Sequence, residues 1–433
     1  MGAASTALPG PGGAMPQPSR MARTTGLGRF DIILIVSLEL HLSFMKIRNI
    51  RLGYWIIALN NAFFWYAPWL LFVYRFIDIR QATILQLAGM VTRILSEIPT
   101  GAFSDLVGKR RTLIIALLLS ATGEILMSFS TNFTQFILVY IVIALGQSFY
   151  SGTIDAFMYD SLVEKKEENK YPSVLSRSNV FLSVSTAIAT ISGGFLFQFW
   201  GGLPFLLTGM AKLLGVLFTL FVTEPKVDTI IFSLKNFVAQ TGKGFTNLFN
   251  AKFIKLTLLL LLLGSFSTVA YEILDDVAVV DWGYNAIGIG ILFTTALVIS
   301  IPSGFLYEYM VKRIKLEFLI ILGVLFLVLN YIFSIWTNVY VWTFLFLIRW
   351  FYSPIKKSAI MDSLNRNSSS DIRATTISTY ELLSRLPFAF LGIPIGSILK
   401  DYGIKFFSVG FSALLLVLLF AGLIINAYHS SRR

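Results

Sequence analysis

Ionisable and amide side chains interrupt the apolar runs of this sequence at only a few positions. In the first half they are Asn60, Asn61, Arg93, Glu97, Glu124 and Asp155. In the second half they are Glu272, Arg349, Lys356, Lys357, Glu381 and Arg385. A charge in apolar surroundings is costly unless it faces a partner or a polar cavity. Each of these positions is therefore a candidate for solute binding or proton transfer.

Two pairs of these charges are spaced four residues apart. Arg93 precedes Glu97, and Glu381 precedes Arg385, so the members of each pair lie on one helix face. Two interpretations are open for each pair. Either the pair neutralises itself, or a desolvated carboxylate carries a proton while the arginine contacts an anionic or polar solute. Glu97 lies close to a basic loop and is the weaker proton carrier.

The elements that hold these residues are long apolar helices. Hydrophobic residues make up 56% of the 433 residues, charged residues 13%, and the mean hydropathy is +0.74. A bilayer core of about 30 Å needs roughly 20 apolar residues per helix. We therefore predict an all-α membrane protein of about 12 transmembrane helices, at 52–76, 81–104, 112–130, 134–160, 173–199, 203–222, 256–280, 286–309, 316–336, 338–362, 373–398 and 405–427.

Basic residues recur in alternate loops between these runs, for example Lys109, Lys165 and Lys312. This is the positive-inside pattern, so we expect both termini on the cytoplasmic side. The net charge of +12 follows from these loops and does not indicate nucleic-acid binding. The loops on the other side of the membrane are short, and the lack of long external loops favours the bacterial cytoplasmic membrane.

The residue types argue against several kinds of site. Cys is absent, and His41 and His429 are the only imidazoles, so we expect neither a metal site nor a disulfide framework. No P-loop or zinc-protease motif occurs, which argues against a membrane-embedded enzyme. We expect no cofactor, and as partners a small solute, protons and the lipid bilayer, with the chain a monomer.

Four segments follow from this pattern. Residues 1–44, rich in Ala, Gly and Pro, are predicted to be a disordered or interfacial extension. Residues 45–222 and 256–433 each hold six spans, which predicts two halves. Residues 223–255 interleave Lys with Ile, Leu and Phe, which predicts an amphipathic cytoplasmic linker.

Two segments of the first half recur in the second at nearly one offset. Residues 98–111 align without a gap to 301–314, at 301 − 98 = 203. Residues 149–162 align to 351–364, at 351 − 149 = 202. Internal duplication is typical of transporter folds, in which the solute path runs between the repeats.

The same offset pairs charged residues of the two halves. Asp155 falls opposite Lys357, since 155 + 202 = 357. A salt bridge that closes the inner ends is one interpretation, and snorkelling of each charge to the interface is another. Asp160 and Asp362 are also equivalent and are expected to be structural.

The first repeated segment resembles a known family. Its pattern, Gly101-x-x-x-Asp105-x-x-Gly108-Lys109-Arg110, is similar to the loop between spans two and three of the major facilitator superfamily. The resemblance covers the chain from about residue 45 onward. It implies two pseudo-symmetric six-helix halves and a gating loop that latches them in the outward-facing state.

A degenerate copy of this loop lies between spans eight and nine, where the family also has one. It reads Gly304-x-x-x-Glu308-x-x-x-Lys312-Arg313, with Val311 in place of the second glycine. We expect it to belong to the same gating apparatus.

The resemblance implies a secondary active transporter of a small solute that works by alternating access, with proton coupling as symport or antiport, efflux included. Drug antiporters of the family carry an Arg in span four, near where Val142 stands here, and span five keeps only the Gly193-Gly194 end of their motif. A lipid or lysolipid flippase and a non-transporting receptor of the same fold remain alternatives.

Five aromatic residues of the predicted spans have two interpretations: they line a cavity, or they form belts at the membrane interfaces. They are Trp65, Tyr66, Tyr150, Trp350 and Tyr352.

Overall fold

The computed structural model describes residues 47–226, 242, 245–250, 254–332, 338–368 and 373–430. The predicted extension 1–44 and most of the predicted linker 223–255 lie outside the described residues. The described residues from Leu52 onward form one compact unit.

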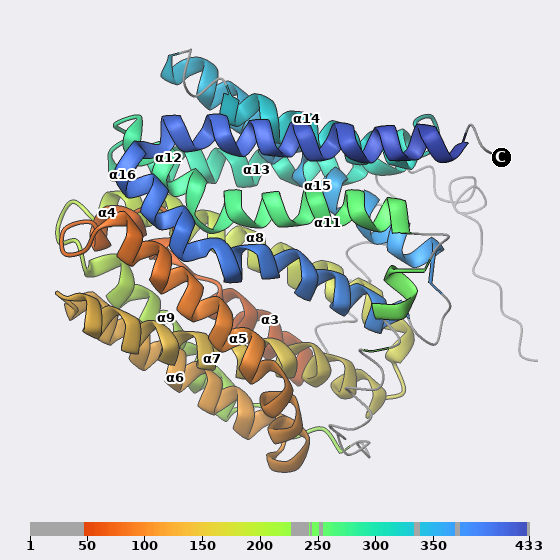
Figure 1. Cartoon of the computed structure of the whole chain (residues 1–433). Coiled ribbons are helices and arrows are strands. Elements are labelled where there is room, and N and C mark those ends of the chain that lie inside the picture. Colours follow the sequence, from red (N-terminus) through yellow and green to blue (C-terminus); the bar gives the residue numbers. More distant parts are fainter. Residues whose placement is uncertain are drawn as a thin grey trace, which may run out of the picture. The chain divides into compact units, whose positions relative to one another are not determined.

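The described residues fold into helices joined by short turns (Figure 1). The first half comprises α3 (Arg48–Asn60), the 3-10 turn η1 (Phe64–Tyr66), α4 (Trp69–Val73), α5 (Ile79–Val107), α6 (Lys109–Phe129), α7 (Phe133–Val163), the 3-10 turn η2 (Glu168–Lys170), α8 (Tyr171–Leu196) and α9 (Leu203–Leu220). The second comprises α11 (Ile254–Val269), the π-helical turn η3 (Ala270–Leu274), α12 (Asp275–Asp281), α13 (Ala286–Met310), α14 (Leu316–Ile332), α15 (Val339–Arg366) and α16 (Arg373–Ser430).

The predicted all-α membrane fold of two six-helix halves is confirmed. Seven of the described helices are long and apolar enough to cross a membrane by length and composition. α16 is two helices that meet at Gly403, where φ is 77°. The first span, predicted as continuous over 52–76, is instead divided into α3, η1 and α4.

Side-chain caps determine where four helices begin. Asp78 accepts from the backbone N–H of Gln81 in a capping box at the start of α5. Asn132, Asn285 and Asn338 cap α7, α13 and α15 in the same way. These four residues mark one end of the bundle, which we call the capped end. The opposite end, which carries the loops with Lys109, Lys165 and Lys312, is the basic end.

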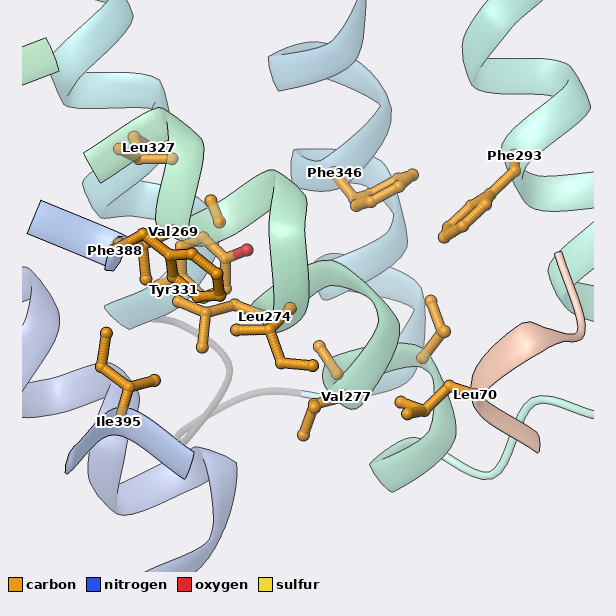
Figure 2. Close-up of a cluster of buried hydrophobic side chains, with 14 of the residues drawn as sticks. Leu70, Val269, Leu274, Val277, Phe293, Leu327, Tyr331, Phe346, Phe388 and Ile395 are labelled. Carbon is orange, nitrogen blue, oxygen red and sulfur yellow. The ribbon is translucent and has the colours of Figure 1, made fainter. Parts of the chain in front are cut away.

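The two halves meet along two helix pairs. α5 packs against α16, and α8 packs against α13. Around these contacts a large cluster of buried apolar side chains joins the halves. Figure 2 shows part of it, with Leu70 of α4 beside Val277 of α12, and Phe293 of α13 facing Phe346 of α15. The halves therefore share one core near the capped end.

The break in the first span has partners that satisfy its backbone. The Ser185 hydroxyl donates to the Ala58 carbonyl at 2.6 Å, and the Thr186 hydroxyl donates to the Asn61 carbonyl at 3.0 Å. The Phe64 N–H donates to the Thr208 hydroxyl at 3.0 Å. Unpaired backbone groups are costly in a bilayer, so these polar side chains of α8 and α9 stabilise the unwound segment.

Candidate functional site

A cavity of about 300 Å³ lies between the two halves. Seven of its lining residues are aromatic: Trp65, Tyr66, Trp69, Tyr140, Tyr271, Phe293 and Trp350. The other five are Gln86, Arg93, Glu272, Asp275 and Asp276. An apolar pocket with a few convergent polar groups is the usual form of a small-molecule site.

The irregular elements of the fold surround this cavity. Trp65 and Tyr66 lie in the unwound part of the first span, and Tyr271 and Glu272 lie in the π-helical turn η3. The Tyr140 hydroxyl donates to the Gln86 side-chain oxygen, and the Gln86 amide donates to the Glu272 carbonyl at 3.1 Å. Departures from α-helical geometry are frequent at functional sites.

Asp275 is held by a buried network. It accepts from the Arg349 guanidinium at 2.5 Å and from the Tyr331 hydroxyl at 2.6 Å, both on Oδ1. Arg349 also donates through Nε to the Asn330 side-chain oxygen at 2.9 Å. Asp275 and Arg349 thus compensate one another's charge.

Asp276 lies beside this network and is 7% exposed. The Trp69 side chain hydrogen-bonds to its carboxylate. Asp276 forms no ion pair within the part of the chain that the structure describes. It is therefore a cavity-lining carboxylate whose charge is not compensated.

A second buried ion pair lies within the first half. The Lys212 ammonium is 2.9 Å from Glu124 Oε1, and the two side chains are 0% and 1% exposed. Lys212 also lies 5.1 Å from the centre of the Phe63 ring, next to the break in the first span. Removal of one partner of such a pair leaves an uncompensated buried charge. We interpret Glu124 as structural, since it does not line the cavity.

The capped end of the interface between the halves is closed. A Cβ placed on Gly396 of α16 would lie 2.9 Å from the Thr83 side chain of α5, and one on Gly194 of α8 would lie 2.5 Å from the Ala286 carbonyl of α13. A Cβ on Gly290 would lie 3.2 Å from the Thr190 carbonyl oxygen. Glycine is needed at these positions because the backbones themselves approach one another.

An ion pair also joins the halves at this end. The Lys400 ammonium donates to Asp78 Oδ2 at 2.8 Å. Burial alone would raise the pKa of Asp78, but hydrogen bonds from Lys400 and from the backbone of Gln81 and Arg80 outweigh it. They hold that pKa below its ordinary value.

The same helix faces separate toward the basic end. Gly101 lies 18 residues, or five helical turns, beyond Thr83 on α5, and a Cβ there would have no neighbour within 4 Å. Gly304 of α13 is equally open. Glu381 and Arg385 continue the face of α16 that carries Gly396, and they are 49% and 42% exposed. The interface is therefore tight at the capped end and open at the basic end.

The predicted gating loop is anchored to its own half. The Lys109 ammonium pairs with Asp160 at 2.5 Å. The Glu224 carboxylate accepts from the backbone N–H groups of Lys109 and Arg110 at 2.6 and 2.8 Å, which caps α6. Arg110 in turn donates to the Leu220 carbonyl at 2.7 Å.

Gly108 makes the turn of this loop, with φ at 97°, where a Cβ would meet Glu224. Asp105, in contrast, is exposed and has no hydrogen-bond or ion-pair partner among the described residues. The anchored loop thus leaves its most characteristic carboxylate free.

The copy in the second half is built differently. Asp362, the equivalent of Asp160, accepts from the Tyr307 hydroxyl at 2.6 Å and pairs with Arg366 at 2.7 Å. Glu308, Lys312 and Arg313 are exposed. The two aspartates therefore hold equivalent loops through different partners.

The other predicted site residues fall into three groups. Arg93 and Glu272 line the cavity, and Arg349 pairs with Asp275 in its wall. Asn60 is buried outside the cavity, and the Asn61 amide donates to the Ile57 carbonyl at 2.8 Å within its own helix.

The third group lies toward the basic end. Glu97, Asp155 and Lys357 are exposed, and none of the three forms a salt bridge with another described residue. The Glu381–Arg385 pair is loose, at 3.9 Å. The structure brings Asp155 and Lys357 into no contact, and Arg93 does not pair with Glu97.

The sequence pointed to some of the cavity aromatics but missed its main carboxylates. Trp65, Tyr66 and Trp350 line the cavity, which is one of the two interpretations of the aromatic residues. Tyr150 and Tyr352 are buried elsewhere. The spacing and repeat patterns of the sequence single out neither Asp275 and Asp276 nor Lys212. Lys212 is the only charge within the apolar run of α9, and this was the available signal.

Comparison with known proteins identifies the family. The model of the major facilitator superfamily matches residues 51–389. The chain belongs to the major facilitator superfamily. No curated protein sequence matches the chain.

Solved transporter structures share the fold of this family member. The nucleoside transporter NupG has a TM-score of 0.72 at 12% identity, over 88% of this chain and 98% of that one. A POT family transporter in complex with 5-aminolevulinic acid has a TM-score of 0.66 at 14% identity, over 88% and 96%. A bacterial homologue of the human lysosomal transporter Spinster, in an inward-facing and unoccupied conformation, has a TM-score of 0.64 at 15% identity, over 88% and 94%.

Proposed function

We propose that this protein is a secondary active transporter that moves a small solute through the central cavity by alternating access. The observation that supports it best is the cavity of about 300 Å³ between two repeat-related halves that are tight at one end and open at the other. Rocking of the halves about this cavity would open the capped end and close the basic end. The basic loops favour the basic end as cytoplasmic, with both termini there, in a bacterial cytoplasmic membrane and as a monomer.

We also propose that transport is coupled to protons through a carboxylate of the cavity. A buried carboxylate without a counter-ion is costly, so binding of a proton or of a cation compensates it. Asp276 meets this description, and Glu272 lies one turn earlier beside it. Glu97 and Glu381, the candidates named from spacing, lie at the open end and are exposed.

Reconstituted vesicles with a trapped pH dye test both proposals. A chemically broad set of solutes is added to vesicles with the wild-type protein, Asp276→Asn or the matched control Glu381→Gln. We expect solute-dependent proton movement that Asp276→Asn abolishes and Glu381→Gln retains.

The other outcomes each contradict one part. Loss with Glu381→Gln alone places the proton site at the open end. Solute equilibration without proton movement indicates a uniporter, and equilibration of labelled lipid alone indicates a flippase. Failure of every solute and lipid to cross favours a non-transporting receptor.

A further inference from the structure

Four aromatic side chains of the cavity close into a ring. Tyr66 lies against Phe293 with ring centroids 5.7 Å apart, and Phe293 lies against Trp350 at 6.4 Å. Trp350 lies against Tyr271 at 6.4 Å, and the Tyr271 and Tyr66 hydroxyls are 3.4 Å apart. The four residues come from η1, η3, α13 and α15, so both halves contribute. We call this set the aromatic ring.

Phe293 also stacks on Phe346 of the buried apolar cluster, with ring centroids 5.8 Å apart, so the aromatic ring is continuous with the core but carries polar groups at its edge. The indole N–H of Trp350 is buried without a hydrogen-bond partner within the described residues. The two tyrosine hydroxyls pair only at the long distance of 3.4 Å. Faces of Trp, Tyr and Phe carry a negative quadrupole, so a ring of such faces attracts cations.

The charges that line the cavity have a negative excess. One positive residue, Arg93, stands against Glu272, Asp275 and Asp276. Arg349 compensates Asp275, and Arg93 is the one described basic residue that lines the cavity beside the other two carboxylates. Lys356 donates to the Ser267 hydroxyl at 2.9 Å and does not line the cavity. One negative charge is therefore left for a ligand, and we assign it to Asp276, which is more buried than Glu272.

Asp276 is close to the ring in the sequence and in the fold. It follows Tyr271 and Glu272 by about one turn across the junction of η3 and α12. Asp275, its neighbour, has a buried Oδ2 without a partner among the described residues. Aromatic faces and an uncompensated carboxylate in one cavity are the two features that recognise an organic ammonium group.

We propose that the cavity binds a small organic ammonium cation, held by the aromatic ring and compensated by Asp276. The proposal names the class of solute. It rests on the proposed transport function only where it treats the bound cation as the transported solute, since binding itself is measurable without transport. The cation–π attraction is about 1–2 kcal/mol for a site between the exposed and the desolvated limits, which corresponds to about five- to thirtyfold in affinity.

Binding of choline and benzyltrimethylammonium to the purified full-length protein in nanodiscs tests the proposal. The comparison ligand is 3,3-dimethyl-1-butanol, the uncharged carbon isostere of choline, and uridine and glutamate represent neutral and anionic solutes. We expect both cations to bind and the isostere to bind at least tenfold more weakly.

Matched variants separate the ring from general stability. Trp350→Leu should weaken cation binding about tenfold, while Trp350→Phe, which keeps an aromatic face, should stay within about threefold. Asp276→Asn should weaken it at least tenfold. Tyr340→Leu, on the 81% exposed Tyr340 of the same helix, should have no effect.

The proposal fails if the isostere binds as well as choline, if uridine or glutamate binds and the cations do not, or if Trp350→Phe is as damaging as Trp350→Leu. The vesicle assay separates this proposal from the proposed transport function. Transport of another solute without cation binding overturns the cation site and retains the transporter. Cation binding without movement of any solute retains the cation site and contradicts the transporter.

Discussion

The two ends of the interface between the halves use the same residue type in opposite ways. At the capped end the helices approach so closely at Gly194 and Gly396 that even a methyl group would overlap a neighbour, and a Cβ on Gly290 would be only 3.2 Å from the Thr190 carbonyl oxygen. At the basic end Gly101 and Gly304 face open space. Glycine destabilises a helix, and no neighbouring group at the open end explains why glycine stands at these two positions. In the proposed transport cycle, Gly101 and Gly304 would serve a second arrangement, in which the basic end is the tight one.

The strongest test of this comparison is to lock the closed end. A Cβ on Gly392 would lie 3.7 Å from the Leu87 Cβ, close to the mean of about 3.8 Å in disulfides. Because the chain has no Cys of its own, the pair Leu87→Cys/Gly392→Cys is free of competing thiols. We expect oxidation to stop transport in vesicles almost completely and reduction to restore it. The single-Cys variants are the controls, and unaltered transport in the oxidised pair contradicts alternation at this interface.

Overpacking should shift the two arrangements in opposite directions. Gly194→Val removes space at the closed end, and Gly101→Val removes space only where the basic end closes. Extra methyl groups in tight contacts cost about 1–3 kcal/mol, which is about 5- to 150-fold in population. The measurement is maleimide labelling of a Glu381→Cys reporter at the basic end. Labelling should fall with Gly194→Val and stay high with Gly101→Val, and equal labelling of the two variants would refute the assignment.

Asp105 gives a smaller effect of the same kind. It has no partner in the open arrangement, so Asp105→Asn should leave the thermal unfolding temperature unchanged. If Asp105 pairs across the closed basic end, its loss costs about 1 kcal/mol, or about fivefold in transport rate. If Asp105→Asn lowers the unfolding temperature as well as the transport rate, Asp105 has a structural role instead.

Loss of the Asp78–Lys400 ion pair should have the smallest effect of these changes, and the effect should be on stability. Its two side chains are 38% and 50% exposed, and exposed ion pairs are weak. Because the pKa of Asp78 in the folded state lies below its ordinary value, the contribution is fully present above that ordinary value and is lost as the pH falls through the folded-state pKa. We expect Lys400→Gln to lower the unfolding temperature slightly at pH 6, and by progressively less as the pH falls below the ordinary Asp range of about 4. An effect that does not shrink as the pH falls argues against this origin.

The fold was accessible from the sequence because its signals are local. Apolar run lengths, alternating basic loops and the repeat at 202–203 residues are all read without tertiary contacts. Even the helix starts repeat, since Asp78 and Asn285 cap equivalent helices, as do Asn132 and Asn338. The break after Asn60 was not accessible, because it depends on Ser185, Thr186 and Thr208 from other helices.

The site was only partly accessible for the same reason. Arg93 and Glu272 stand out as charges in apolar runs, and both line the cavity. Whether a charge is compensated depends on pairs that are distant in sequence, such as Asp275 with Arg349 and Glu124 with Lys212. Spacing therefore favoured Glu381, which is exposed, over Asp276, which is buried beside the cavity.

The capping of α6 by Glu224 has a mechanical counterpart in the second half. There the Asn247 amide donates to the Ser368 and Thr376 hydroxyls at 3.0 and 3.1 Å. The chain between the halves is thus fastened at two points that are 247 − 224 = 23 residues apart. Such a length reaches at most about 80 Å if fully extended and about 35 Å if wholly helical. In the proposed transport cycle, this reach is the upper limit on how far the two anchored points can move apart.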